Sequence, residues 1–586
     1  MKIYKIIGIL AAGSLMPVLT SCYDLDRTPG YQVSSEAFFL TEEHCKQAMM
    51  AVYHIMHSED AFGMMPQFDG LGPICNLANG GSFNFRNILT NNYSANTGDI
   101  KSRWQVYYEG VARSNNVIQN VDRADMTDEL KLRYKAEARF FRGLFYFSLL
   151  DLWGGVPIYD DTFDVGSNYM NMLYPRSSAE EVREFVLKDL GFAADVLPDK
   201  WDEANYGRVT SGAAMSLKGK VLLYGKRYKE AAECFQAVID SHLYELYPDY
   251  AALFTPEGHS SREMIFAIQN LGGLGQDIGI PLATYLGSRS TYTLNGTGCF
   301  NRVLPSNAIV AEYEWADGRP FDWEEFIPGF NTNYTGASGN PWPTRQATFL
   351  ATLASDKKSV KKYPKDKDKL VKMWNERDPR LNANVILPYM HYTGWYKQQP
   401  VDLEFVVCKK IQDGNGMIRL DKDRLCYLWR KFVPTGDMGG LIHEAGHTPI
   451  NFPLIRYADV LLMQAECLNE LGRQDDAVKL INQVRSRPSV NMPGINSGPD
   501  YLAAAGRDEV FKRIRHERLC ELACEGHSFS DYRRWGVLEE LDGVEEGHMT
   551  GDYLFSTRVI TPRQYLWPIP LTEIDRNPAL EQNPGY

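Results

Sequence analysis

Two blocks of this 586-residue chain follow one pattern: GKVLLYGKRYKEAAECFQAVI (219–239) aligns without a gap with AECLNELGRQDDAVKLINQVR (465–485). Each block predicts a helix, a tight turn at a glycine, and a second helix whose small alanine, Ala231 or Ala477, allows the two helices to pack closely. Stacked antiparallel helix pairs of this kind form tetratricopeptide repeats, which bury a continuous core. The two blocks therefore predict a tetratricopeptide-like helical scaffold.

Further helices are predicted upstream of the first block. Apolar residues recur at helical spacing in residues 102–122 and 127–150, and again after Ser178. Thr127 is a predicted N-cap, and Pro198 should follow the end of the third helix. Because more than two helix pairs are needed to bury a solenoid core, we expect these helices to complete the scaffold.

The composition changes between the two blocks, where Gly, Pro, Asn and Thr become frequent. Short runs typical of strands occur at MIFAIQ (264–269), FVVCKK (405–410) and LCYLWRKFV (425–433). An irregular stretch of this length in a compact protein usually carries function. The sequence thus predicts an all-α-dominated fold with minor β structure, in which helical segments at about 22–254 and 451–586 flank a loop-rich insert at about 255–450.

The N-terminus has the features of a lipoprotein signal. Two lysines precede an apolar run of 14 residues, 6–19, which is followed by Thr20-Ser21-Cys22. A helix of that length spans about 21 Å, too short for a hydrocarbon core of about 30 Å. The ending L-T-S-C resembles the bacterial lipobox, so we predict a signal peptide at 1–21 and lipid attachment at Cys22. The alternative is an ordinary cleaved signal that leaves Cys22 as a free thiol.

The charge balance argues against nucleic acid as a partner. The chain has 62 Lys and Arg against 74 Asp and Glu, a net charge of −12, whereas nucleic-acid binders usually carry a basic stripe. The lysine-rich segment 355–369 is interpreted as a solvated loop. Nine further cysteines are scattered and form no C-x-x-C pair, so the sequence predicts neither a disulfide framework nor a cysteine metal site.

One literal zinc-protease motif, H-E-x-x-H, occurs at His443, Glu444 and His447. In zinc enzymes this motif lies on a helix, which places both histidines on one face. Here glycines and prolines surround it, so a loop is favoured and a zinc hydrolase is kept as a less favoured alternative. No other catalytic signature occurs. No EF-hand spacing is present, although the acidic loops would allow a structural calcium ion to bind. We predict no catalytic residue, metal or cofactor.

Aromatic residues in the loops suggest a surface for sugars, whose C–H faces lie flat on aromatic rings while their hydroxyls pair with planar polar groups. The candidate ligand-binding residues are Phe83, Asn92, Tyr93, Asp277, Tyr285, Arg289, Tyr292, Tyr334, Trp342 and Trp395. Trp342 is the leading candidate because Pro341 and Pro343 stiffen its backbone. Packing is the alternative for each aromatic, and Trp104, Trp153, Trp535 and Trp567 are assigned to the core.

The C-terminal motifs resemble the RagB/SusD family. They are NFPLIRYADVLLMQAECLNELG (451–472), RIRHERLCELACEGHSFSDYRRWG (513–536) and YLWPIPLTEIDRNPALEQNPGY (565–586), with AEARFFRGLFYFSLLDLWGGVPI (136–158) in support. In the second motif, Glu517, Glu521 and Glu525 are predicted to form a structural ion network with Arg515, Arg533 or Arg534. The tail, residues 582–586, is predicted to dock on the body.

The resemblance implies a non-catalytic outer-membrane lipoprotein of Bacteroidetes that faces the cell surface and captures glycans. It also implies a partner, a SusC-like TonB-dependent transporter that receives the oligosaccharide, and ligand contacts from loops of the insert. A binder of peptides or another nutrient on the same scaffold remains the alternative.

Overall fold

Helices dominate the computed structural model, with 48% of residues in helices and 10% in strands, which confirms the predicted fold class. The structure describes residues 38–586 except 79–84, 164–171, 274–278, 291–292, 295–296, 333–341, 397, 412–415, 421, 423 and 443–447. Every sheet among these residues consists of two antiparallel strands. The strands therefore form small additions to a helical body and do not build a layer of their own.

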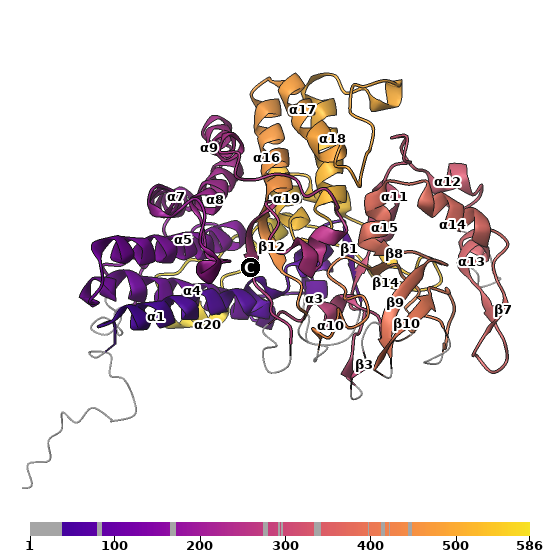
Figure 1. The fold of residues 1–586 in the computed structure, drawn as a ribbon, viewed down its shortest axis with the longest axis horizontal. Coiled ribbons are helices and arrows are strands. Elements are labelled where there is room, and N and C mark those ends of the chain that lie inside the picture. The colour runs from indigo at the N-terminus through magenta and orange to yellow at the C-terminus, as the bar shows by residue number, and fades with distance from the viewer. Residues whose placement is uncertain are drawn as a thin grey trace, which may run out of the picture.

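The scaffold is built from helices at the two ends of the chain (Figure 1). Its N-terminal helices are α1 (Glu42–His54), α2 (Pro66–Leu71), α3 (Phe85–Leu89), α4 (Gly98–Asn120), α5 (Asp128–Trp153), α7 (Ala179–Val196), α8 (Ser211–Tyr224) and α9 (Tyr228–Asp240). Its C-terminal helices are α16 (Tyr457–Glu470), α17 (Gln474–Arg485), α18 (Gly506–Glu521), α19 (Ser528–Trp535) and α20 (Leu571–Arg576). Helices α16 to α18 stand beside α8 and α9, so segments far apart in sequence share one body.

The predicted helix ends are confirmed by their caps. The Thr127 hydroxyl accepts a hydrogen bond from the backbone N–H of Leu130, and α5 begins at the next residue, as an N-cap requires. Ser178 and Glu181 form a reciprocal capping box at the start of α7. That helix ends at Val196, before Pro198.

The two similar blocks form helix pairs, α8–α9 and α16–α17, as predicted. Both small residues of the pattern, Ala231 and Ala477, are fully buried. The first pair also depends on Gly219, because a Cβ atom there would lie 2.6 Å from Cε1 of Phe235 in the facing helix. Small residues on both sides of the contact thus permit the close packing of α8 on α9.

The insert contains short helices and most of the strands. Its helices are α10 (Leu282–Leu286), α11 (Asn307–Glu312), α12 (Trp323–Phe326), α13 (Pro343–Phe349), α14 (Lys367–Asn375) and α15 (Pro379–Asn384). Its strands are β2 (Met264–Ile268), β3 (Thr293–Leu294), β4 (Thr297–Gly298), β5 (Val303–Pro305), β6 (Thr352–Leu353), β7 (Val360–Lys362), β8 (Val385–Ile386), β9 (His391–Tyr396), β10 (Gln399–Glu404) and β11 (Leu428–Trp429). Outside it lie β1 (Cys75–Leu77), β12 (Phe452–Arg456), β13 (Glu545–Gly547) and β14 (Leu554–Thr557).

Two expectations about strands need correction. FVVCKK (405–410) is not a strand: its apolar side chains are buried, but its backbone bonds irregularly, as in the 3.0 Å bond from Ala351 N–H to the Val407 carbonyl. The helical segment predicted from about residue 451 begins instead with strand β12, which pairs with β2. Apolar runs of this length cannot distinguish a strand from other buried structure.

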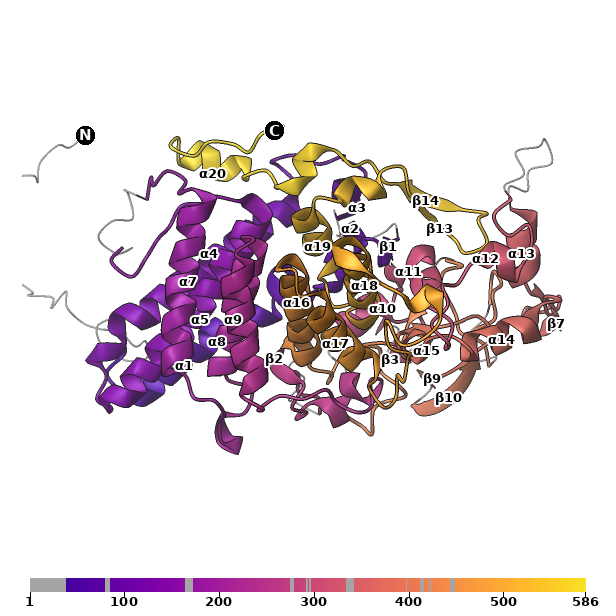
Figure 2. The ribbon, with the colours of Figure 1, turned by 90° about the horizontal axis from the view of Figure 1, so that it is seen from above.

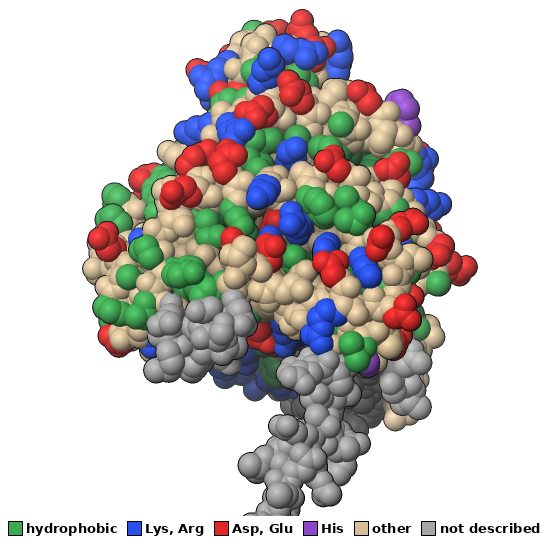
Figure 3. Space-filling model, turned by 90° about the vertical axis from the view of Figure 1, so that its left-hand side faces the viewer, with side chains coloured by type: hydrophobic (Ala, Val, Ile, Leu, Met, Phe, Trp, Pro, Cys, Tyr) green, Lys and Arg blue, Asp and Glu red, His purple; other side chains and the backbone are tan. Residues whose placement is uncertain are grey.

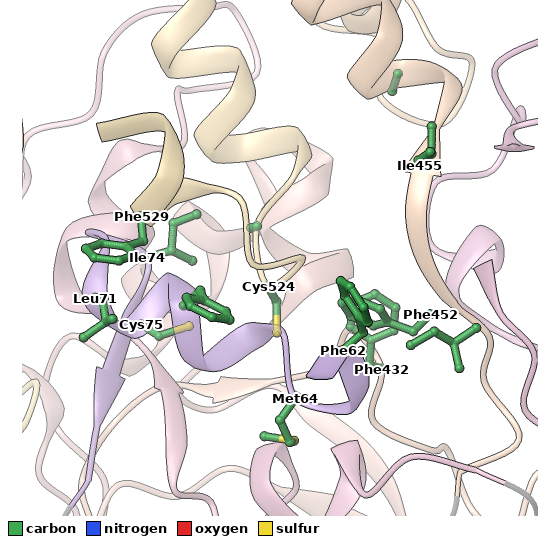
Figure 4. Packing of buried hydrophobic residues seen from close by; sticks show 14 of the residues in the cluster. Phe62, Met64, Leu71, Ile74, Cys75, Phe432, Phe452, Ile455, Cys524 and Phe529 are labelled. Carbon is green, nitrogen blue, oxygen red and sulfur yellow. The ribbon is translucent and has the colours of Figure 1, made fainter. Parts of the chain in front are cut away.

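One continuous hydrophobic core joins the three parts of the chain. Around Cys524, side chains from the N-terminal segment, the insert and the C-terminal segment meet, for example Phe62, Phe432 and Phe452 (Figure 4). Trp104, Trp153 and Trp567 are buried as predicted, and Trp535 is half-buried. The nine cysteines of the described residues are all free and buried. The insert is therefore fixed to the scaffold by shared packing.

A buried ion network joins the insert to α18. Its members are Glu263, Glu314, Asp378, Arg380, Lys431, Arg456, Arg485, Arg487, Glu517, Glu521 and Glu525. Burial by itself would raise the pKa of Glu521, but the guanidinium groups of Arg487, Arg456 and Arg380 hold this pKa well below its usual range. The carboxylate is therefore charged and serves as a hub between distant segments.

The ionic role predicted for Glu517, Glu521 and Glu525 is confirmed, but their predicted partners are wrong. Arg515 pairs with Glu540, Arg533 with Asp151 and Arg534 with Glu466. The predicted arginines belong to the same motif, 513–536, whereas the actual partners of the glutamates come from other elements, for example Arg380 and Arg456.

The C-terminal tail docks on the body, as predicted. The buried Asn583 side chain donates hydrogen bonds of 3.0 and 2.7 Å to the carbonyls of Trp153 and Trp567. Figure 2 shows α20 and the C-terminus along the upper edge of the molecule. Among the described residues, no helix combines the length and hydropathy needed to cross a membrane.

Acidic and basic side chains are interspersed on the face of the molecule that Figure 3 shows. At the left-hand end of the molecule, Lys and Arg alternate with Asp and Glu, and neither sign forms a continuous band (Figure 3). This end offers no basic stripe of the kind that binds nucleic acid.

Candidate functional site

Five side chains of the insert form a mixed aromatic and cationic surface on the side of the molecule opposite the tops of α16 to α18. They are Tyr285, Arg289, Phe300, Arg302 and Trp395, and we call this surface the insert face. Tyr285 belongs to α10 and Trp395 to β9. Arg289 follows α10 in the sequence, and Phe300 and Arg302 precede β5. Helix α10 and strand β9 lie on the lower side of Figure 1.

Helix α10 and residues 300–302 are held together by their backbones. The N–H groups of Phe300, Asn301 and Arg302 donate to carbonyls of residues 284–287 at 2.7 to 2.8 Å. Buried Leu282 and Leu286 anchor α10 in the core, which leaves Tyr285 half-buried at the surface. The surface therefore stands on a rigid base, which lowers the entropy cost of binding.

The aromatic rings of this base are interleaved with guanidinium groups. The Arg302 guanidinium carbon lies 4.9 Å from the Phe300 ring centroid and 5.9 Å from that of Tyr285. The Arg289 guanidinium carbon also lies over the Phe300 ring, 5.4 Å from its centroid. Stacking of this kind fixes the orientation of flat donors beside flat rings.

Tyr285 also reaches across to the N-terminal part of the chain. Its hydroxyl donates a 3.0 Å hydrogen bond to Oε2 of Glu59, in the π-helical turn Glu59–Gly63. Burial and the Glu59 carboxylate raise the pKa of Tyr285 to about 12, so the hydroxyl keeps its proton. The Glu59 carboxylate thus adds an acceptor, and the Tyr285 hydroxyl a neutral donor, to the guanidinium groups of the insert face.

Trp395 is placed next to α10 by the hairpin of β9 and β10. The ring packs on a small cluster of Ala283, Cys299 and Ile442. The preceding residue must be glycine, because a Cβ at Gly394 would lie 2.3 Å from the Ser290 carbonyl oxygen. This close approach brings β9 against the segment that carries Arg289.

The structure therefore brings together three of the predicted ligand-binding residues, Tyr285, Arg289 and Trp395. It adds Phe300, Arg302 and Glu59, which the sequence did not single out. Phe300 and Arg302 follow the candidates Tyr285, Arg289 and Tyr292 closely in the sequence, which is the local signal that could have included them. Glu59 carries no local signal, because 226 positions separate it from Tyr285.

Trp342, the leading candidate, lies elsewhere. It is the N-cap of α13, toward the far end of the insert from α10 in both ribbon views (Figures 1 and 2). The Arg345 guanidinium carbon lies 3.9 Å from its ring centroid, and a Cβ at Gly551 would lie 2.2 Å from its Cδ1. The half-buried ring thus packs between α13 and the turn of the β13–β14 hairpin.

The prediction for Tyr93 is corrected by its burial. Only 7% of its surface is exposed, and its ring packs against Tyr586 and under the Arg563 guanidinium group. It anchors the C-terminal tail and lacks the open ring face that a sugar needs. Its neighbour Asn92 is exposed.

Several predicted residues lie outside the described part of the chain. These are Cys22, Phe83, Asp277, Tyr292, Tyr334, His443, Glu444 and His447. Within the described ranges, no group of three or more His, Cys, Asp or Glu residues is placed to hold a metal ion.

Comparisons with known proteins agree with this architecture. The model of the SusD family matches residues 262–586, and a model described as "starch-binding associating with outer membrane" matches residues 32–223. SusD-like protein P38 of Formosa agariphila is 25% identical over 579 residues, which cover 97% of this chain and 96% of that protein.

Solved structures share the fold along nearly the whole chain. A SusD-like carbohydrate-binding protein from Bacteroides fragilis has a TM-score of 0.73 at 23% identity, covering 93% of this chain and 100% of that one. Surface glycan-binding protein A of Bacteroides thetaiotaomicron, in complex with laminarihexaose, has a TM-score of 0.62 at 20% identity, covering 93% and 99%. Because the first family model alone spans more than half of the 586 residues, the resemblance seen in the C-terminal motifs is confirmed, and this protein belongs to the SusD family.

Proposed function

We propose that this protein binds oligosaccharides or polysaccharide at the insert face and passes them to a TonB-dependent transporter of the outer membrane, without catalysing a reaction. The observation that carries the proposal is the grouping of Tyr285, Phe300 and Trp395 with two guanidinium groups. Support also comes from the family: one matching model is described as starch-binding and associated with the outer membrane. Two relatives are described as binding carbohydrate or glycan.

The chemistry of the insert face suits a neutral, hydroxyl-rich ligand. A sugar ring can lay its C–H face on Trp395 or Tyr285 while its hydroxyls accept from the arginines and donate to Glu59. The rigid backbone beneath the rings limits the ordering that binding requires. Such a surface favours capture and release over tight retention, which is what a protein that passes its ligand onward needs.

Affinity gel electrophoresis against a panel of polysaccharides tests the proposal. The wild-type protein should be retarded by at least one of them. Trp395→Ala and Tyr285→Ala should each weaken that binding about tenfold, because a lost aromatic stack costs on the order of 1–2 kcal/mol. Isothermal titration with the matching oligosaccharide would then give the change in Kd.

Tyr206→Ala is the matched control, since Tyr206 is 52% exposed, lies between α7 and α8 and is not part of the insert face; its hydroxyl donates to the carbonyl of His259. It should bind as the wild type does. Retardation by none of the polysaccharides, or equal binding by the insert-face variants and the control, would contradict the proposed function. Retention on immobilised peptides in place of glycans would favour the alternative nutrient.

Attachment to the membrane through Cys22 is part of the same proposal and rests on the lipobox. Cys22→Ala should move the protein from the membrane fraction into the soluble one, or leave the precursor unprocessed, because acyl chains provide the only anchor that the sequence predicts. Fractionation in high salt, followed by immunoblotting, measures this. Membrane attachment of the variant that resists high salt would show that another anchor exists.

A further inference from the structure

A second concave site lies between the ends of the helix pairs, on the opposite side of the molecule from the insert face. It is an open groove of about 260 Å³ formed by the α8–α9 turn, the C-terminal end of α16, the first turns of α18 and the end of α19. In Figure 1 these helices rise at the upper side, whereas α10 and β9 lie below. We call it the tip groove.

The floor of the tip groove is rigid. Glu466, which is 3% exposed, accepts hydrogen bonds from both terminal nitrogens of Arg534 and, at 3.0 Å, from Nε1 of Trp535. Asp531 holds Arg534 from the other side at 2.9 Å. Because these buried charges are paired with each other, the floor keeps its shape and needs no counter-ion.

The walls present groups that can still bind. Arg507 and Glu470 form a bidentate pair at 3.1 and 2.7 Å, yet the Arg507 side chain is 62% exposed. Within the described residues, the half-buried Tyr228 hydroxyl has no hydrogen-bond partner, and its ring has no ring or cation partner. Lys226 and Asp508 are exposed at the rim.

These groups define the chemistry of a ligand. The groove is lined by three cationic side chains and three carboxylates. The lining therefore has no net charge that would favour an ionic ligand. Burial and the nearby carboxylates raise the pKa of Tyr228, which keeps its hydroxyl neutral. Donors and acceptors line the groove together with the half-buried Tyr228 ring, which also packs against the core. The volume of the tip groove lies just below the range of about 300–1,000 Å³ that is typical of pockets for drug-sized ligands.

We propose that the tip groove is a second carbohydrate site that takes a single sugar residue or the end of a glycan chain. This inference rests on the proposed function, since it assigns the same ligand class. A long polysaccharide that engages both sites, or two protein molecules at once, binds more tightly than a short oligosaccharide, which occupies one site at a time and the insert face in preference. The tip groove thereby favours polymers over their fragments.

The test uses the full mature protein and the polysaccharide that retards the wild type most in the gel panel. Tyr228→Ala and Arg507→Ala should each weaken polysaccharide binding about threefold to tenfold, because they remove one of two linked contacts. Both should leave the Kd for a tetrasaccharide of the same glycan unchanged. In a Trp395→Ala background, either substitution should abolish the residual retardation.

Arg473→Ala is the matched control. Its side chain is 61% exposed and pairs with Asp476 at 2.7 Å, much as Arg507 pairs with Glu470, but it lies outside the tip groove. Melting temperatures should stay within a few degrees for all three variants, which excludes unfolding as the cause of lost binding. Tyr228→Phe provides a milder variant that removes only the hydroxyl.

The outcomes separate the two proposals. If the wild type binds a polysaccharide and the groove variants bind it as Arg473→Ala does, the tip groove is not a carbohydrate site and the proposed function stands. If no polysaccharide retards the wild type, the proposed function itself fails. A loss of tetrasaccharide binding in the groove variants would also overturn the inference, because it would place them in the primary site.

Discussion

Glu521→Gln should lower the free energy of unfolding by about 3–5 kcal/mol, since breaking a buried ion pair leaves charge without compensation. The Glu521 carboxylate is fully buried and accepts hydrogen bonds from three guanidinium groups: Arg380 at 3.0 Å, Arg456 at 2.9 Å and Arg487 at 2.7 Å. Glutamine keeps the shape but not the charge. Urea unfolding followed by circular dichroism measures the difference.

Glu540→Gln serves as the control for this prediction. Glu540 pairs with Arg515 at 2.6 Å, but its side chain is 52% exposed, so water screens the pair and the loss should stay below about 1 kcal/mol. Equal losses in the two variants would show that burial of the network contributes nothing.

The pH dependence of the Glu521 effect has a definite sign. The pKa of this carboxyl is lower in the folded protein than its ordinary value of 4.5. Its stabilising contribution is therefore complete above that ordinary value and is lost as the pH falls through the lowered pKa. The difference between wild type and Glu521→Gln should be constant from pH 6 to 8 and should shrink progressively below pH 4.5. A difference that grows in acid would contradict the assignment.

Trp567→Ala should cost about 3–5 kcal/mol of stability, the usual range for deleting a fully buried aromatic side chain. The ring is fully buried and its centroid lies 5.7 Å from that of Trp153 and 6.0 Å from that of Phe68. The backbone carbonyl of Trp567 also accepts from Asn583, so the cavity would loosen the docked tail. Thermal unfolding measures the loss.

Trp395→Ala is the informative comparison for Trp567→Ala. The half-buried Trp395 packs on a small cluster at the surface, so its removal should affect stability much less and glycan binding much more. A melting temperature of Trp567→Ala equal to that of the wild type would mean that the C-terminal segment is not part of the core.

Local patterns in the chain are sufficient to predict the helical scaffold. Helix formation depends on apolar residues one turn apart and on caps, and both are local: Thr127 and Ser178 mark helix starts that the structure reproduces. The helix-pair pattern around Ala231 and Ala477 is local in the same way, because one turn separates the two helices of each pair. The family motifs and the burial of Trp153 and Trp567 were also readable from the chain.

Contacts between residues far apart in the chain became visible only in the folded structure. Tyr285 reaches Glu59 across 226 positions, and Arg380 reaches Glu521 across 141, and no periodicity records such separations. The same limit explains why the sequence predicts an exposed ring at Tyr93, since the tail residue that covers it, Tyr586, lies 493 positions away. Local spacing fixes the shape of each helix, whereas the partners of loop and ionic side chains depend on how the segments cross in space.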